Sequence, residues 1–169
     1  MRKLFFVLIA VATLSFVACE KEKSEVDGTN NQTSVGIVGN WLSAGDNVAP
    51  LLVTYFQVDS ITAEFKSNNT YDVTSYSGGV PTAYVGNYVQ EKSGTGNIWK
   101  ITLNQSTPTA VTSEGIFEIT KEGTNYTMKY EVVQTEPNIG STPPTPEGGF
   151  GSTNGGAIGD INIQKFVKR

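Results

Sequence analysis

Apolar and polar residues alternate along much of the chain beyond residue 35. Every second residue of the segment 99–103 is apolar, and the residues between them are lysine and threonine. The same alternation recurs at 61–65, at 71–74 and at 126–132. This one-sided pattern is typical of antiparallel sheets, in which one face packs in the core and the other meets water. The acidic residues opposite these apolar faces are therefore expected on the solvated outer surface: Glu64, Asp72, Glu118 and Glu131.

Turn-forming residues separate the alternating segments. Clusters of glycine, asparagine, serine and threonine recur roughly every ten residues, which is the spacing of turns between short strands. Helical periodicity beyond residue 35 is not sustained for more than about two turns. Short strands that follow one another without intervening helices are typical of a barrel or a sandwich. The predicted strands are 36–42, 51–57, 60–66, 70–76, 83–91, 97–104, 115–121, 125–134 and 160–167.

One interval, 135–159, lacks strand character. It holds four prolines, seven glycines and a single aromatic residue, Phe150. A loop of this length without secondary structure is uncommon inside a compact domain, so we expect a functional loop, a flexible one or a misassigned element. Beyond it, Ile161, Ile163 and Val167 resume a strand-like alternation. We interpret them as a last strand that closes the sheet against its first.

The N-terminal segment has the pattern of a secretory signal peptide. Two basic residues, Arg2 and Lys3, precede an apolar run that ends at residue 17. The run is too short for a typical membrane-spanning helix. A small residue, Ala18, stands directly before the only cysteine of the chain, Cys19. We therefore predict that 1–18 is a signal peptide that is removed on export.

The pentapeptide SFVAC at 15–19 resembles the lipobox of bacterial lipoproteins, in the relaxed form found in Bacteroidetes. The resemblance implies that Cys19 becomes the mature N-terminus and carries acyl chains, which anchor a protein stably in a membrane. The alternative is an ordinary secreted protein whose cysteine is incidental. Because Glu20 follows the cysteine, the aspartate signal that retains enterobacterial lipoproteins at the inner membrane is absent. We expect a lipid-anchored protein of the outer membrane, on its periplasmic face or at the cell surface.

Charge and polarity divide the mature chain into a tether and a domain. Residues 19–34 contain a single large apolar residue, Val26, and read as a flexible tether, whereas 35–169 form the β domain. Removal of the signal peptide takes two of the twelve basic residues and none of the sixteen acidic ones, which leaves a net charge of −6. An acidic chain of this kind is not expected to bind nucleic acid.

Composition excludes much catalytic chemistry. The chain has no histidine and one cysteine, so Ser-His or Cys-His nucleophile pairs, histidine-ligated metals and an internal disulfide are all ruled out. The glycine-rich stretch GTG at 94–96 joins two predicted strands and lacks the lysine and helix of a phosphate loop. No spacing singles out a Ser-Lys dyad or a pair of catalytic carboxylates. We expect no enzyme, no catalytic residues, no metal and no cofactor.

Short motifs resemble those of the lipocalin-like lipoproteins of Bacteroidetes, small antiparallel barrels related in shape to the calycins. GNW at 39–41 matches the G-x-W that opens lipocalin-type barrels, and FKSNNTY at 65–71 resembles the family's F-x-x-N-G-T-Y hairpin. GNY at 86–88 and WKITL at 99–103 resemble the strands that follow. The resemblance implies an all-β fold, an antiparallel up-and-down β-barrel of about 8–9 strands that is wide enough for one small ligand. It implies no shared catalytic set.

The aromatic residues on the predicted inner faces leave two interpretations open. They can fill the core of the barrel outright, as aromatic side chains do in small β proteins. They can instead line a cavity in which tyrosine hydroxyls and a tryptophan ring bind a small amphipathic molecule or the face of a sugar. The candidate ligand-binding residues are Trp41, Tyr88, Trp99, Tyr126 and Tyr130.

Two functional hypotheses follow from these interpretations. The first is a non-enzymatic envelope lipoprotein whose barrel binds a small apolar or amphipathic ligand. The second is a structural or interaction module with a filled barrel, which docks an envelope protein or a glycan through its rim and the loop 135–159. Phe56, Tyr76 and Phe150 are expected on an external contact surface. A cavity of ligand size would favour the first hypothesis, and a packed interior the second.

Overall fold

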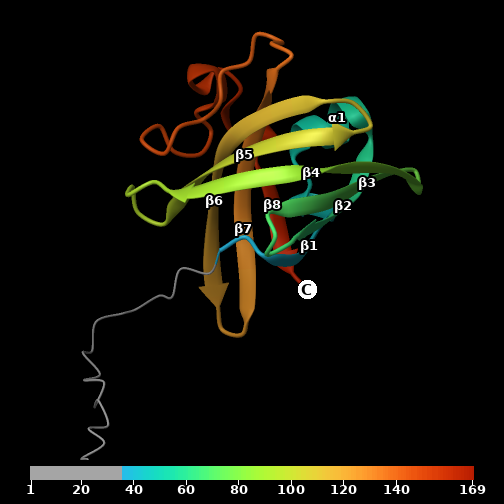
Figure 1. Cartoon of the computed structure of the whole chain (residues 1–169), viewed down its shortest axis with the longest axis horizontal. Helices are drawn as coiled ribbons and strands as arrows, with labels where there is room; N and C mark the ends of the chain where they lie inside the picture. Colours follow the sequence, from blue (N-terminus) through green and yellow to red (C-terminus); the bar gives the residue numbers. More distant parts are fainter. Residues whose placement is uncertain (1–35) are drawn as a thin grey trace, which may run out of the picture. The chain divides into compact units, whose positions relative to one another are not determined.

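Eight antiparallel strands close into a barrel in the computed structural model of the chain, which describes residues 36–169 (Figure 1). Each strand pairs with the next along the chain, and β8 returns to pair with β1. The strands are β1 (Gly39–Ala44), β2 (Val58–Phe65), β3 (Thr70–Ser77), β4 (Val80–Lys92), β5 (Ile98–Thr107), β6 (Val111–Glu122), β7 (Asn125–Glu136) and β8 (Gln164–Lys168). The expected all-β fold, an antiparallel up-and-down barrel consistent with the lipocalin-like type, is confirmed. The predicted signal peptide, Cys19 and the tether 19–34 lie outside the described residues.

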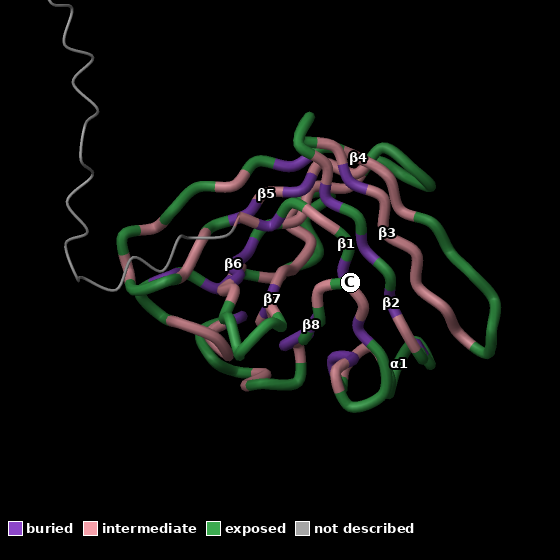
Figure 2. The backbone as a smooth tube through the Cα atoms, turned by 90° about the horizontal axis from the view of Figure 1, so that it is seen from below, coloured by how far each residue is buried: buried purple, intermediate pink, exposed green. Residues whose placement is uncertain are grey.

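The alternation of apolar and polar residues predicts the strands well, because each strand has one face in the core. The segments predicted for β1 through β7 all coincide with a strand, with ends that differ by a few residues. Along β2, for example, Ile61, Ala63 and Phe65 are buried, and the residues between them are exposed. Figure 2 shows the same change between buried and more exposed residues along several strands. The inward positions of consecutive strands therefore form one continuous core.

The strand predicted at 51–57 is wrong, because this segment is the helix α1 (Pro50–Phe56). Proline stands at the first turn, where its missing N–H costs no hydrogen bond. The helix ends at Gln57, which adopts a left-handed backbone with φ of 55° and donates its N–H to carbonyls of the last turn. A run of five apolar residues among seven gave no alternation that could separate a strand from a short helix.

The last predicted strand, 160–167, is correct only in its second half. Its first residues form a 3-10 turn, η3 (Gly159–Asn162), and the strand β8 begins at Gln164. The inward residues of β8 are Gln164 and Phe166, whereas Val167 is exposed. The predicted closure of the sheet is confirmed, since Leu42 of β1 pairs with Val167. A buried glutamine broke the apolar pattern on which the prediction relied.

One end of the barrel, here called the floor, is filled with large side chains. It is the end at which the short β2–β3, β4–β5 and β6–β7 turns lie. Trp41 Nε1 donates a hydrogen bond of 2.7 Å to the carbonyl of Ile37, and the Tyr88 hydroxyl donates one of 2.9 Å to the carbonyl of Lys66. The floor residues are at most 2% exposed: Ile37, Trp41, Tyr88, Ile101, Phe117 and Met128. The floor is therefore both close-packed and satisfied in its hydrogen bonds.

The opposite end, here called the mouth, carries the longer connections. These are the segment from β1 to β2 with η1 (Gly45–Asn47) and α1, and the segment from β7 to β8 with η2 (Thr153–Gly156) and η3. The turns from β3 to β4 and from β5 to β6 lie at the same end. Helix α1 and the turn η3 lie in contact with one another. The mouth is thus covered by non-strand segments, whereas the floor is closed by side chains.

The long segment between β7 and β8, residues 137–163, packs against the outside of the barrel. Glu131, on the outer face of β7, is fully buried beneath it. The Glu131 carboxylate accepts hydrogen bonds from the backbone N–H of Gly151 at 2.6 Å, from that of Thr153 at 3.2 Å and from the Thr153 hydroxyl. The prediction that Glu131 is solvated is wrong. Alternation assigns it correctly to the outer face but carries no information about a later segment that covers this face.

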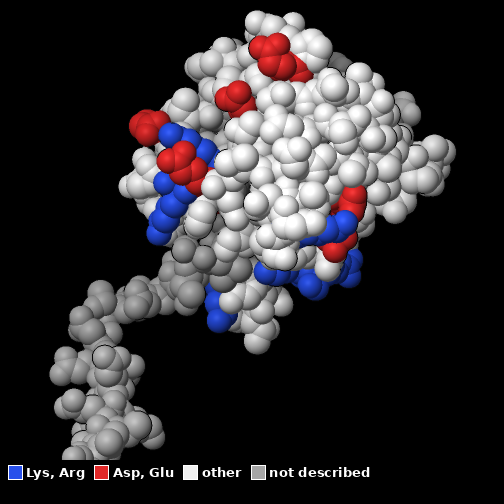
Figure 3. Space-filling model, viewed as in Figure 1, with Lys and Arg blue, Asp and Glu red and all other residues white. Residues whose placement is uncertain are grey.

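The other predicted outer carboxylates meet solvent. Glu64 is exposed, and Asp72, which forms an ion pair with Lys66, keeps 43% of its side chain exposed. On the face shown in Figure 3 the charged side chains gather toward the edges and leave the middle uncharged.

Candidate functional site

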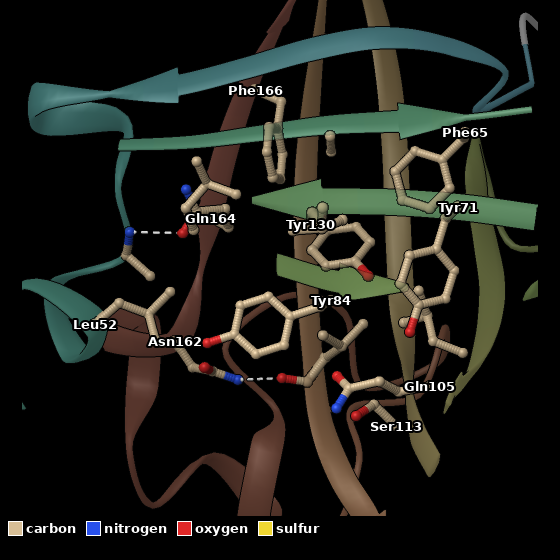
Figure 4. A pocket seen from close by; sticks show the side chains of 16 residues that line it. Leu52, Phe65, Tyr71, Tyr84, Gln105, Ser113, Tyr130, Asn162, Gln164 and Phe166 are labelled. Atoms are coloured by element: carbon tan, nitrogen blue, oxygen red, sulfur yellow. Dashed lines mark hydrogen bonds between the residues drawn. The ribbon is translucent and has the colours of Figure 1, made fainter. Parts of the chain in front are cut away.

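A cavity of about 240 Å³ occupies the barrel between the floor and the mouth (Figure 4). Its wall takes residues from every strand except β1, and α1 and η3 contribute Leu52 and Asn162 from the mouth. Most of the lining is apolar, as in ligand sites generally. None of the sixteen lining residues carries a charge. The site is therefore an apolar chamber with a small number of neutral polar groups.

Two side-chain amides hold the mouth segments against the barrel wall. Gln164, pointing inward from β8, accepts a hydrogen bond of 2.9 Å from the N–H of Ala49, directly before α1, and donates one to the hydroxyl of Ser43. Asn162 of η3 donates a hydrogen bond of 3.0 Å to the carbonyl of Val132 on β7. These contacts explain why a glutamine is buried at 5% exposure on an inward face. Both amides therefore form hydrogen bonds within the protein, and other polar groups of the lining face the cavity.

Figure 4 shows the hydroxyls of Tyr71, Tyr84, Tyr130 and Ser113 at the cavity, with no hydrogen bond to another lining residue. All three amides of the lining form hydrogen bonds, since Gln105 also donates one of 2.8 Å to the carbonyl of Thr109. Within residues 36–169, no side-chain nitrogen or oxygen is both sealed from solvent-sized probes and unpaired. The unpaired hydroxyls therefore open onto the cavity, where a bound molecule or water can reach them.

Burial keeps the deeper tyrosines protonated. Tyr71 is 3% exposed, and burial raises the pKa of its hydroxyl to about 12. Burial also raises the pKa of Tyr130, and the nearby Tyr71 adds to this effect because two phenolates would repel each other. Both side chains are consequently neutral at physiological pH. They present O–H donors and lone pairs to the cavity and no charge.

Of the five ligand-binding residues predicted from the sequence, Tyr130 alone lines this cavity. Trp41 and Tyr88 belong to the floor, where their polar atoms bond to backbone carbonyls. Trp99 stacks on Phe117 with ring centres 5.9 Å apart. Tyr126, half-buried on β7, has the ammonium groups of two lysines 5.6 Å from its ring centre. The structure thus gathers four of the five residues around the filled part of the barrel.

The barrel differs between its two ends. The floor is filled, and the part toward the mouth is hollow. The polar lining residues that the sequence analysis left out as ligand-binding candidates are Tyr71, Tyr84, Gln105, Ser113, Asn162 and Gln164. Three of them could have been predicted, because residues an even number of positions apart in a strand point to the same face. Tyr84 is on the same face as Tyr88, Gln105 on the same face as Leu103, and Ser113 on the same face as Phe117.

A larger hollow of about 550 Å³ lies within the segment 137–163, lined by residues such as Pro143, Phe150 and Ser152. Its lining is rich in glycine, proline and threonine and comes from this segment alone. The barrel cavity instead joins residues from seven strands and holds several converging hydroxyls. Convergent polar groups in an apolar chamber mark a binding site better than volume does, so the barrel cavity is the candidate site.

Comparisons with protein-family models, with curated proteins and with solved structures gave no match for this chain. Within the described residues, no group of three or more acidic or cysteine side chains is arranged to hold a metal ion. No helix in residues 36–169 is long and apolar enough to cross a bilayer. The functional argument accordingly rests on the geometry and chemistry of the barrel cavity.

Proposed function

We propose that this protein is a non-enzymatic, lipid-anchored envelope protein whose lipocalin-like barrel binds one small apolar or amphipathic molecule. The observation that carries the proposal is the uncharged cavity of about 240 Å³ inside the barrel, with tyrosine hydroxyls exposed to it. An apolar cavity of about 150 Å³ takes up benzene. A chamber about one and a half times as large suits a ligand of one substituted ring or a short branched chain.

Binding, and not catalysis, is the activity that these side chains support. The cavity lining contains hydroxyls and amides, but no carboxylate, lysine or cysteine that could act as an acid, a base or an activated nucleophile. Tyr71 and Tyr130 are neutral at pH 7, as tyrosines ordinarily are, and burial raises their pKa values further. Groups of this kind orient a ligand by hydrogen bonding and leave it chemically unchanged.

The cellular location in the proposal rests on the N-terminal sequence pattern. Lipidation of Cys19 would hold the barrel at the outer membrane, on its periplasmic face or at the cell surface, and the tether would give it freedom to move. Replacement of the acylated cysteine tests this part alone. Cys19→Ser should move the protein from the membrane fraction to the soluble fraction, and a variant that stays with the membranes would contradict the anchor.

The ligand-binding part is tested on the purified Cys19→Ser protein with 1-aminonaphthalene, a neutral fluorescent molecule of suitable size. Val73 lines the cavity, and its neighbour Thr74 lies on the other face of β3. Val73→Phe should fill the chamber and abolish the fluorescence increase, whereas Thr74→Phe should preserve it. Ser113→Leu, with Glu114→Leu as its control, repeats the test at a second wall position. Failure of the wild-type protein to bind the dye or to copurify with a small molecule in native mass spectrometry would remove the support for this function.

A second candidate function is an interaction module that docks an envelope protein or a glycan through the rim. The observation in its favour is the outer side of α1, where Val53, Tyr55 and Phe56 are 46%, 73% and 61% exposed. Large apolar side chains gathered in this way are uncommon on isolated monomers. If Tyr55→Ser with Phe56→Ser disrupts an envelope complex that Val73→Phe leaves intact, docking is the better account. Loss of function in Val73→Phe alone favours ligand binding.

A further inference from the structure

The deepest polar groups of the cavity are two phenol hydroxyls from opposite parts of the barrel wall. Tyr71 projects from β3, and Tyr130 projects from β7. Figure 4 shows both hydroxyls turned into the same region of the chamber, with no hydrogen bond drawn to either. The interaction between the two ionisable groups agrees with this placement, because Tyr71 contributes to the raised pKa of Tyr130. The pair is held apart from the amides that brace the mouth.

Unpaired hydroxyls in an apolar chamber are costly unless something bonds to them. The floor of the same barrel shows the usual solution, since the Tyr88 hydroxyl bonds to a backbone carbonyl at 2.9 Å. Phenylalanine would pack as well at positions 71 and 130 if packing were the whole role of these rings. Two donors without a protein acceptor favour an occupant that brings an acceptor, because only such a molecule replaces the hydrogen bonds that water can make with them.

We infer that the ligand is a neutral molecule with an apolar body and one hydrogen-bond-accepting oxygen, such as a ketone, ester or ether, which the hydroxyls of Tyr71 and Tyr130 bind together. This assignment rests on the proposed ligand-binding function and adds the chemical class of the ligand. An oxygen with two lone pairs accepts both donors at once. The rest of the ligand lies against apolar wall residues such as Leu103 and Phe166.

A carboxylic acid fits this chamber poorly. Neither lysine nor arginine is among the sixteen lining residues, so an ionised carboxylate would be buried without a countercharge. The cost of burying an unpaired charge far exceeds what two neutral hydrogen bonds return. A pure hydrocarbon avoids this cost but leaves both hydroxyls unpaired. The site therefore discriminates against acids strongly and against hydrocarbons moderately.

The test compares three compounds of similar size by calorimetry at pH 7 on the Cys19→Ser protein: butyrophenone, n-butylbenzene and 3-phenylpropionate. The ketone should bind about 5- to 10-fold more tightly than the hydrocarbon, in line with the net value of one or two neutral hydrogen bonds. The carboxylate should bind at least about 100-fold more weakly than the ketone. A carboxylate that binds as well as the ketone would overturn the inference.

Matched variants connect this preference to the two hydroxyls. Tyr71→Phe and Tyr130→Phe should each lower the affinity for butyrophenone by about 3- to 10-fold without lowering that for n-butylbenzene, because each removes one donor and no apolar surface. Tyr126→Phe, outside the cavity lining, is the control. Equal binding of ketone and hydrocarbon, with no effect of either variant, overturns the assignment of the ligand class and leaves the binding function standing. Absence of binding by all three compounds overturns both.

Discussion

The floor and the cavity wall are built by the same strands from the same kinds of residue, but their side-chain polar atoms differ in what they face. In the floor, Trp41 and Tyr88 bond to backbone carbonyls at 2.7 and 2.9 Å. In the wall, Tyr71 is buried and Tyr130 is half-buried, and both turn their hydroxyls toward the chamber, where neither bonds to another lining residue. An inward aromatic residue thus belongs to the core when its polar atom bonds to the backbone, and to the candidate site when its polar atom faces the cavity. The floor stabilises the barrel, and the wall is the part to which the proposed ligand-binding function is assigned.

The largest expected difference between the two regions concerns truncation of a large aromatic residue. Phe117→Ala removes a floor side chain that is 0% exposed and should cost about 4 kcal/mol of the free energy of unfolding. Phe166→Ala removes a ring that already borders the cavity, so it loses fewer contacts and should cost about 2–3 kcal/mol. Urea denaturation of both variants measures the difference. Equal costs would mean that the wall is packed like the floor and that the comparison fails.

The next effect tests whether Glu131 holds the segment 137–163 against the outside of the barrel. Glu131→Ala leaves two backbone N–H groups and the Thr153 hydroxyl without their acceptor. We expect a loss of about 2–3 kcal/mol and a segment that detaches from the barrel. Hydrogen exchange should show faster exchange at Gly151 and Thr153, with the floor amides unchanged. Glu64→Ala, at an exposed site, is the control and should change stability by less than about 0.5 kcal/mol.

An intact floor combined with increased exchange in the segment 137–163 in Glu131→Ala would show that the floor is stable without this segment. Faster exchange at Trp41 or Phe117 would contradict this, because it would mean that the segment 137–163 supports the whole barrel. The position of η3 makes the outcome informative for binding as well. Asn162, at the end of this segment, both lines the cavity and bonds to Val132.

The strands could be predicted from the sequence because their burial has a period of two residues, as the series through Trp99, Ile101 and Leu103 shows. Helix α1 could not, since its apolar residues show no strand or helix period over only seven residues and only Pro50 marks its start. The burial of Glu131 depends on a contact with residues about twenty positions later, which no local pattern contains. The alternation along a strand thus predicts on which face of the sheet a residue lies, but not which segment covers that face.

The candidate site was predictable only in part, and for a related reason. All five predicted residues are aromatic, but the division between floor and cavity depends on the register between strands. Gly86 illustrates this: a Cβ atom there would lie 2.2 Å from the carbonyl oxygen of Asn104 on the neighbouring strand. Such close approach, next to a shift in register between β4 and β5, shapes the interior. The resulting chamber is a property of the closed barrel and not of any one segment.

A smaller effect compares the same substitution in the two regions. Tyr88→Phe removes the hydroxyl that bonds to the carbonyl of Lys66 and should cost about 1–2 kcal/mol. Tyr130→Phe removes a hydroxyl that bonds to no other lining residue and should change the free energy of unfolding by less than about 0.5 kcal/mol. Thermal or urea unfolding without ligand checks both values. A large loss in Tyr130→Phe would show that its hydroxyl has a structural partner and would weaken its assignment to ligand binding.

The smallest effect is a dependence of stability on alkaline pH that originates in the wall. Burial raises the pKa of Tyr71 to about 12, above the value of 10.0 for a free tyrosine side chain. Because the folded state holds this proton more tightly than the unfolded state, the resulting stability is fully present below pH 10 and declines as the pH rises toward 12. Tyr71→Phe should therefore unfold at a higher pH than the wild type, as followed by circular dichroism, with Tyr55→Phe on exposed α1 as the control. An alkaline midpoint that does not move in Tyr71→Phe would mean that the hydroxyl reaches bulk water, and the chamber would then be too wet at that depth to discriminate a ketone from an acid.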